Sequence, residues 1–179
     1  REAVAETIEN NVRSKILQDH LNDPAYYEKM SALLDELIQT RKAKAVEYEA
    51  YLQQIAELAA KVETGHTDET SQRLDTPGKR ALYNMLVKLR QSNPSASSHV
   101  AVHEPTPTGL GAATGDAEDA LLGLAVQIHE TVQRVRPDGW RGNRPKERVI
   151  QGALFTLLGQ SSEVEQVFPI IQSQAEYWG

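Results

Sequence analysis

The chain contains no cysteine, which excludes disulfides, thiolate metal sites and cysteine nucleophiles. Aromatic residues make up only 6% of its 179 residues, so we expect an aliphatic core and an elongated shape. No apolar run approaches the roughly 18 residues that a membrane-spanning helix needs, and no segment resembles a signal peptide. These absences lead us to expect a soluble, cytoplasmic protein.

Strand patterns of useful length are also missing, and the hydrophobic residues recur at helical spacing instead. We expect an all-α helical bundle of about six helices, one of them very long. Besides the long helix, the pattern predicts helices near 2–18, 76–90, 116–135, 145–158 and 161–177. Pro169 should kink or split the last of these.

Residues 91–115 differ in composition, because Ser, Pro, Gly, Thr and Ala fill 17 of these 25 positions. This composition predicts a flexible loop or insertion. We therefore assign 1–90 to N-terminal helices and 116–179 to C-terminal helices that pack on the first part, all within one domain.

The longest helical pattern covers about 24–62, with Pro24 in its first turn and Asp23 or Asn22 as the cap. A continuous helix of this length would measure about 58 Å. Its apolar residues have the alternating three-and-four spacing of a helix seam, namely Met30, Leu34, Leu37, Tyr48, Tyr51, Ile55, Leu58 and Val62. Of these, we expect Leu37, Ile55 and Leu58 to be buried.

Arg41 and Lys44 occupy two positions of this seam that should be apolar. Either the helix leaves its local partner there, or the two basic groups meet something acidic. Since an unpaired buried charge is costly, we expect the free chain to leave both accessible and a partner protein to cover them.

The net charge of −6 argues against general affinity for a polyanion, yet residues 136–150 carry a net charge of +3. A tight turn there joins Trp140 to the bases Arg141, Arg144, Lys146 and Arg148. Such a turn before a helix N-terminus could bind phosphate or a carboxylate-rich partner. In the alternative interpretation, Trp140 closes the end of the bundle and the arginines pair with surface carboxylates.

Catalytic motifs are not found in the sequence. It has neither a GxxxxGK[ST] loop nor a GxGxxG after a strand. His99 and His103 lie in the Ser/Pro/Gly-rich segment and are expected to be solvated, while His20 and His129 are expected at the surface or its boundary. We therefore expect no catalytic residue, no metal site and no cofactor.

Three stretches, in this order, carry a family resemblance. They are NDPAYYEKMS at 22–31 continuing into EYEAYL at 47–52, DTPGKRALYN at 75–84, and DGWRGN at 138–143 followed by KER at 146–148. Together they resemble the C-terminal helical region of the R (restriction/motor) subunit of type I restriction-modification enzymes. The resemblance runs from about residue 8 to Tyr177, and 91–115 departs from it as an insertion.

The resemblance implies a piece of a longer, ATP-dependent type I site-specific deoxyribonuclease. Its nuclease and motor motifs would lie in other parts of that protein, so no catalytic residue is carried over. The C-terminal part of such subunits is associated with docking onto the methyltransferase core, which consists of modification and specificity subunits. We therefore expect a non-catalytic assembly module that meets DNA through the parent assembly. The alternative is a DNA-contact module that uses the basic turn around Trp140.

Overall fold

The computed structural model describes residues 2–67, 72–93 and 113–178, and every regular element among them is a helix. The prediction of an all-α fold is confirmed for these residues. The chain divides into two compact units, 1–70 and 71–179. Most of the expected loop at 91–115 falls on residues 94–112, which lie outside the described part.

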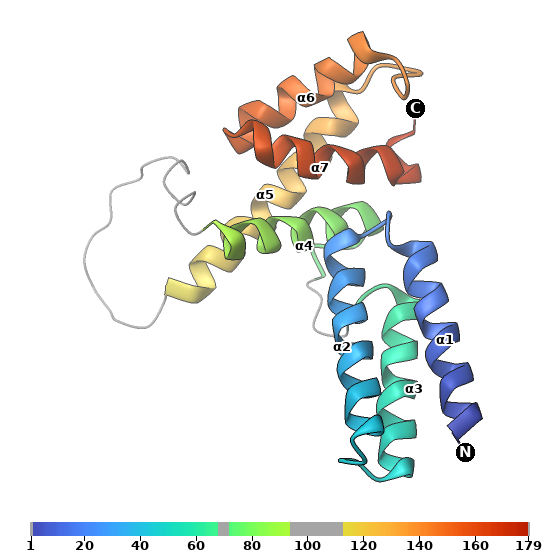
Figure 1. Ribbon diagram of the computed structural model, residues 1–179. Helices are drawn as coiled ribbons and strands as arrows, with labels where there is room; N and C mark the ends of the chain where they lie inside the picture. The colour runs from blue at the N-terminus through green and yellow to red at the C-terminus, as the bar shows by residue number, and fades with distance from the viewer. Residues whose placement is uncertain (1, 68–71, 94–112, 179) are drawn as a thin grey trace. The chain divides into compact units, whose positions relative to one another are not determined.

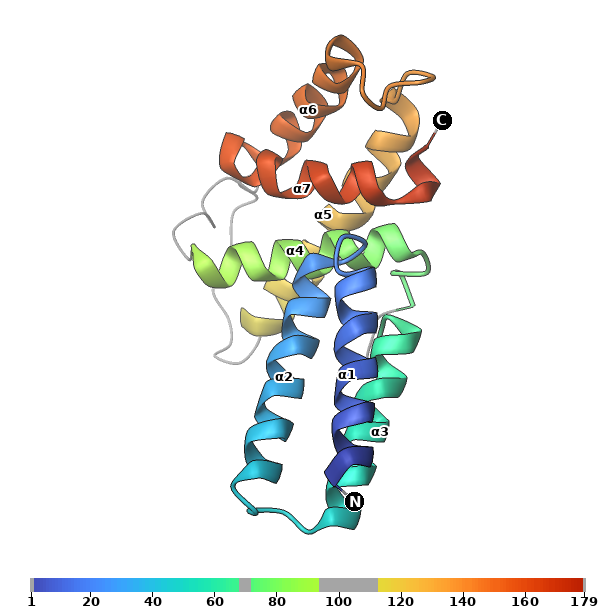
Figure 2. The ribbon, with the colours of Figure 1, turned by 45° about the vertical axis from the view of Figure 1, so that its right-hand side comes forward.

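The first unit consists of three helices, α1 (Glu2–Asp19), α2 (Pro24–Lys42) and α3 (Tyr48–Thr64), and each contacts the other two. Figures 1 and 2 show them side by side, with α2 running opposite to α1 and α3. Hydrogen bonds join the start of α2 to the end of α3. The hydroxyl of Tyr26 donates to the carbonyl of Lys61 at 2.7 Å, and that of Tyr27 to the carbonyl of Val62 at 3.4 Å.

The prediction of one very long helix over 24–62 is wrong, because residues 43–47 separate α2 from α3. Lys44 adopts a left-handed conformation with φ of 54°, which is unfavourable for a residue with a Cβ. Packing explains the break. In a straight helix the two halves of the seam would lie end to end on one face, spread over about 58 Å, and could not contact each other, whereas a hairpin places them face to face. The strained turn is thus compensated by the burial of both stripes.

The ends of several helices follow from local sequence. Asp23, Thr76 and Asn143 each cap a helix by accepting a hydrogen bond from the backbone N–H three residues on, and a proline lies in the first turn of each helix. Gly65 ends α3 at φ of 71°, and a Cβ there would lie 3.2 Å from the Tyr27 hydroxyl. Glycine adopts this conformation without strain and leaves the Tyr27 hydroxyl in place.

The second unit contains α4 (Pro77–Ser92), α5 (Ala113–Val135), α6 (Arg144–Leu158), α7 (Ser161–Ser173) and the short 3-10 helix η2 (Ala175–Tyr177). Each α-helix contacts the next, and α7 returns to contact α4. Helix α4, which we grouped with the N-terminal helices from sequence, belongs to this second unit.

Helix α7 continues through Pro169 and ends at Ser173. Proline removes the backbone N–H that would bond to the carbonyl four residues earlier, that of Glu165. Both residues are on the exposed side of α7, where water can hydrate that carbonyl. The helix is therefore not split at Pro169, and it ends at Ser173 instead of continuing to about Tyr177.

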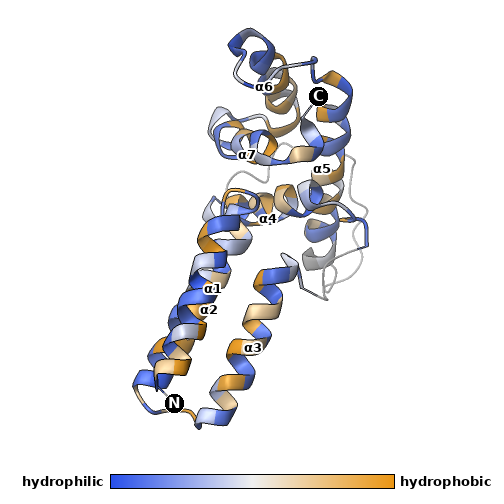
Figure 3. Ribbon diagram, turned by 90° about the vertical axis from the view of Figure 1, so that its right-hand side faces the viewer, coloured by the Kyte–Doolittle hydropathy of each residue, from blue (hydrophilic) through white to orange (hydrophobic). Residues whose placement is uncertain are grey.

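Each unit has its own hydrophobic core. In Figure 3 hydrophobic residues recur along the helices with hydrophilic residues between them, as expected for helices that bury one face. Ile55 and Leu58 are buried as predicted, whereas Leu37 is only partly buried. The large, fully buried side chains of the first core are Met30, Leu34, Tyr51 and Ile55. In the second they are Leu82, Leu86, Ile128, Trp140, Ile150, Leu154, Ile170 and Tyr177.

Candidate interaction site

Arg41 does not form an accessible docking site. Its Nε donates to Oε1 of Glu9 at 2.7 Å and its NH2 group donates to Oε2 at 3.2 Å. The Tyr51 hydroxyl donates to the same Oε1 at 2.6 Å, and the guanidinium lies 5.8 Å from the centre of the Tyr51 ring. Glu9, Arg41 and Tyr51 belong to α1, α2 and α3, so the cluster links all three helices.

The charge in this cluster is well compensated. Burial alone would raise the pKa of Glu9, but hydrogen bonds from Arg41 and Tyr51 outweigh it and hold the pKa below its ordinary value. The Arg41 side chain is only 12% exposed. The expectation that a partner protein covers an accessible Arg41 is therefore wrong, because the acid that meets this base comes from α1 of the same chain.

Lys44 differs from Arg41, since it lies exposed in the connection between α2 and α3. Its backbone N–H donates to the carbonyl of Arg41 at 2.9 Å. Its ammonium forms no ion pair within the part of the chain that the structure describes. The two bases that interrupt the seam thus have separate environments and do not form one surface.

Trp140 lies inside the second unit with 0% exposure. Its indole N–H donates to the carbonyl of Tyr177 at 2.8 Å, and its ring centre lies 5.9 Å from that of Phe168. This placement agrees with the alternative in which Trp140 closes the end of the bundle. Its side chain cannot contact a partner while the unit is folded, so we no longer assign it to the interaction site.

An aromatic–arginine pair does form beside the turn, with a different tryptophan. The guanidinium of Arg141 stacks over the ring of Trp178, 3.9 Å from its centre. Trp178 is 48% exposed, and its indole N–H donates to the carbonyl of Gln172 at 3.1 Å. Trp178 could not be predicted as a partner from the sequence, because it is 37 residues away from Arg141 and no local pattern joins them.

The turn itself is held by its own polar groups. The Lys146 ammonium donates to the carbonyl of Asp138 at 2.5 Å, so this base is engaged within the turn. The carboxylate of Glu147 accepts from the backbone N–H of Gly142 at 3.0 Å and from the amide of Gln172 at 3.1 Å. These bonds fix the turn against α7.

Arg144 and Arg148 remain as the exposed cations at the start of α6. Neither has an ion pair or hydrogen bond from its guanidinium among the described residues. The backbone N–H groups of a helix N-terminus add positive potential at the same place. Arg141, Arg144 and Arg148, which we call the arginine surface, would therefore attract anionic groups.

The outward face of α6 also carries apolar side chains. Val149 is 50% exposed and Phe155 is 49% exposed. Val149 precedes Ile150 in the sequence, but about 100° separates consecutive residues on a helix. Ile150 is buried in the core, and Val149 consequently lies on the solvent side.

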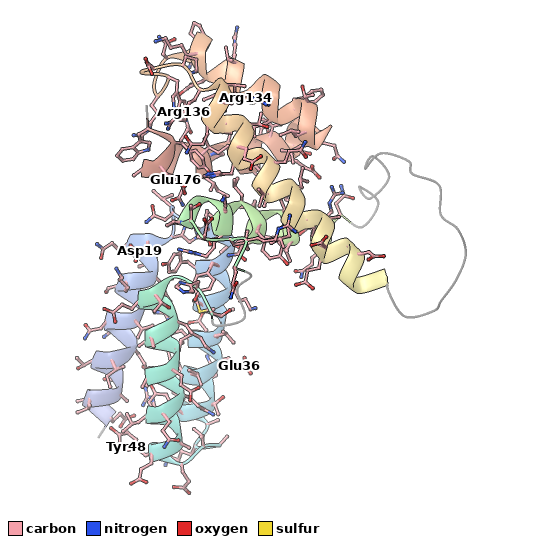
Figure 4. All side chains as sticks on the ribbon, turned by 180° about the vertical axis from the view of Figure 1, so that it is seen from behind. Asp19, Glu36, Tyr48, Arg134, Arg136 and Glu176 are labelled. Carbon is pink, nitrogen blue, oxygen red and sulfur yellow. The ribbon has the colours of Figure 1, made fainter. Side chains whose placement is uncertain are left out.

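A second polar cluster ties the C-terminal residues to the unit (Figure 4). Glu176 accepts from the backbone N–H of Gly78, and its carbonyl accepts from Arg136 at 2.9 Å. The hydroxyl of Tyr177 lies 2.7 Å from Nδ1 of His129. Burial lowers the pKa of His129, partly offset by the Glu176 carboxylate 3.7 Å away. The groups of this cluster bond to one another and hold η2 in place.

His20 also has a nearby carboxylate, since its Nε2 lies 3.9 Å from Oε1 of Glu28. His99 and His103 lie outside the described residues.

Across 2–67, 72–93 and 113–178, no three His, Asp or Glu side chains gather closely enough to hold a metal ion. None of the described helices is long and apolar enough to cross a membrane.

Comparison with known proteins yields no relative: no family model, no curated protein and no solved structure matches the chain.

Proposed function

We propose that the chain is an assembly module of the R subunit of a type I restriction-modification enzyme. In this proposal it holds the ATP-dependent DNA translocase and nuclease subunit on the methyltransferase core, in the cytoplasm, and has no catalytic residue or cofactor of its own. The support comes from the three ordered sequence motifs, each of which contains a residue that caps a helix, namely Asp23, Thr76 and Asn143.

The observation that carries the proposal is the arginine surface. Arg141 and Arg148 belong to the third motif of the resemblance and Arg144 lies between its two parts, on a chain with a net charge of −6. A local concentration of arginines that form no ion pair among the described residues favours a specific acidic partner over general polyanion binding. Because Arg41 is paired with Glu9, the arginine surface is a stronger candidate for docking than Arg41.

Binding of the full chain to a purified methyltransferase core tests this proposal. The triple variant Arg141→Ala, Arg144→Ala and Arg148→Ala should bind about tenfold more weakly, with the difference shrinking at high salt. The matched control removes three exposed positive charges from the first unit, in the variant Lys29→Ala, Lys42→Ala and Lys61→Ala. Absence of binding by the unaltered, folded chain at tens of micromolar would refute the proposal.

A second candidate function is duplex DNA contact during translocation. The feature that favours it is the pair Arg144 and Arg148, four residues apart on one side of α6 and both without an acidic partner among the described residues. Three arginines could neutralise about three phosphates, which gives a shallow salt dependence. Binding of the chain to a fluorescent duplex, lost in the arginine triple variant but kept in the lysine triple variant, would favour this function.

A further inference from the structure

We infer that the outer face of α6 receives an acidic amphipathic helix of the methyltransferase core. This inference rests on the proposed function and identifies the partner chemistry at the same site. The face centres on a row formed by Arg144, Arg148, Gly152 and Phe155, which we call the α6 outer row.

Helix geometry aligns the four residues of this row. Their spacings of four, four and three residues place them within roughly 80° of arc on a helix of 3.6 residues per turn. They extend over about 16 Å along the axis. All four are exposed, while α5 and α7 contact α6 and its residues Ile150, Leu154 and Leu158 are buried.

The row has two chemically different ends. Arg144 and Arg148 form a cationic end at the helix N-terminus, and Phe155 forms an apolar end. An amphipathic helix laid along a complementary surface is a common mode of recognition. Charge complementarity requires that such a helix bring Asp or Glu side chains to the arginines and apolar side chains to Phe155.

Gly152 lies between the two ends and leaves the surface flat. A Cβ built on it would meet no atom within 4 Å, so nothing within the described residues requires a glycine there. Glycine within a helix destabilises that helix, but it permits the close approach of another backbone. We assign Gly152 to the closest point of contact with the partner helix.

Gly123 provides a matched control for this assignment. It also lies within a helix, α5, and a Cβ on it would likewise meet no atom within 4 Å. A glutamine at either position has a higher helix propensity than glycine and adds a side chain of the same size. If only contact with the partner matters, Gly152→Gln should weaken binding to the methyltransferase core about tenfold and Gly123→Gln should leave it unchanged.

The two ends of the row are tested separately on the full chain. Phe155→Ala should weaken binding about tenfold at any salt concentration, whereas Leu17→Ala, at an exposed leucine of α1, should not. Arg144→Glu with Arg148→Glu should weaken binding most strongly at low salt. Circular dichroism of each variant verifies that it is folded.

Photo-cross-linking identifies the occupant. With benzoylphenylalanine in place of Phe155, the chain should cross-link to a segment of a modification or specificity subunit that has apolar residues at three-and-four spacing and nearby acids. A cross-link to a second copy of this chain, to duplex DNA or to a segment without acids would overturn the inference. So would core binding that is unaffected by all α6 variants, and in that case the proposed function would still stand. If the unaltered chain does not bind the core, the proposed function itself fails.

Discussion

The carboxylate of Glu9 and the guanidinium of Arg41 form a two-point contact, Nε to Oε1 at 2.7 Å and NH2 to Oε2 at 3.2 Å. This contact joins α1 to the end of α2, where a continuous helix would otherwise proceed. With Tyr51 as third member, it stabilises the hairpin that replaces the long helix. The basic group that interrupts the apolar seam is thus part of the fold of the first unit.

Breaking this contact should destabilise the chain. Glu9→Gln leaves Arg41 without its counter-charge, and Arg41→Glu places two carboxylates together, so each should cost roughly 2–4 kcal/mol of unfolding free energy. Lys44→Glu, at the exposed turn, should change it by less than about 0.5 kcal/mol. Urea unfolding followed by circular dichroism measures all three. If Arg41→Glu unfolds at the same urea concentration as the parent, the cluster is not structural.

The same cluster predicts a pH dependence. Burial tends to raise the pKa of Glu9, but its hydrogen bonds from Arg41 and Tyr51 keep the folded-state pKa below the ordinary value of 4.5. The unfolded chain therefore takes up this proton first as the pH falls. The stabilisation by Glu9 should be complete above pH 4.5 and should decline as the pH falls from there through the folded-state pKa. Unfolding curves of the parent and Glu9→Gln should accordingly differ at pH 7 and converge in acid. A constant difference would contradict this.

In the first unit, the loss of unfolding free energy on replacing a leucine by alanine should increase with the burial of that leucine. Leu58→Ala, at a buried position, should cost roughly 2–5 kcal/mol. Leu37→Ala should cost clearly less, because Leu37 is only partly buried. Leu17→Ala, at a side chain 71% exposed, serves as the control and should be close to neutral. Equal losses for Leu58 and Leu17 would show that the α3 stripe is not the core.

The two tryptophans should give different fluorescence. In Trp178→Phe, emission comes from Trp140 alone and should be blue-shifted and resistant to acrylamide, since its ring is buried. In Trp140→Phe, emission comes from the half-exposed Trp178 and should be red-shifted and readily quenched. Trp140→Ala should cost about 3–5 kcal/mol. Trp178→Ala should cost about 1 kcal/mol, the value of an exposed cation–π pair. Identical quenching of the two single-tryptophan proteins would contradict the assignment.

Local signals in the sequence predicted most helix boundaries. Asp23, Thr76 and Asn143 have side chains that cap a helix, and the prolines that follow cannot donate within it, so these starts are encoded within a few residues. The end of α2 has no such signal. No proline or glycine occurs at 43–47, and the break depends on packing between α2 and α3 and on Glu9, which lies 32 residues before Arg41.

The candidate site was predictable only in part for the same reason. The run of bases from Arg136 to Arg148 is visible in the sequence, and it does surround a tight turn. Which tryptophan faces solvent depends on the C-terminal residues. The backbone carbonyl of Tyr177 accepts a hydrogen bond from the indole N–H of Trp140, and Trp178 is half-exposed. Likewise, the exposure of Phe155 follows from which side of α6 meets α5 and α7.

A structure of the complete assembly tests the central claim most directly. In an electron-microscopy map of the R subunit bound to its methyltransferase core, the arginine surface should lie against a modification or specificity subunit. The α6 outer row should then be covered by a helix of that subunit, with acids beside Arg144 and Arg148. A map in which α6 faces solvent, while another surface of this chain contacts the core, would contradict the account.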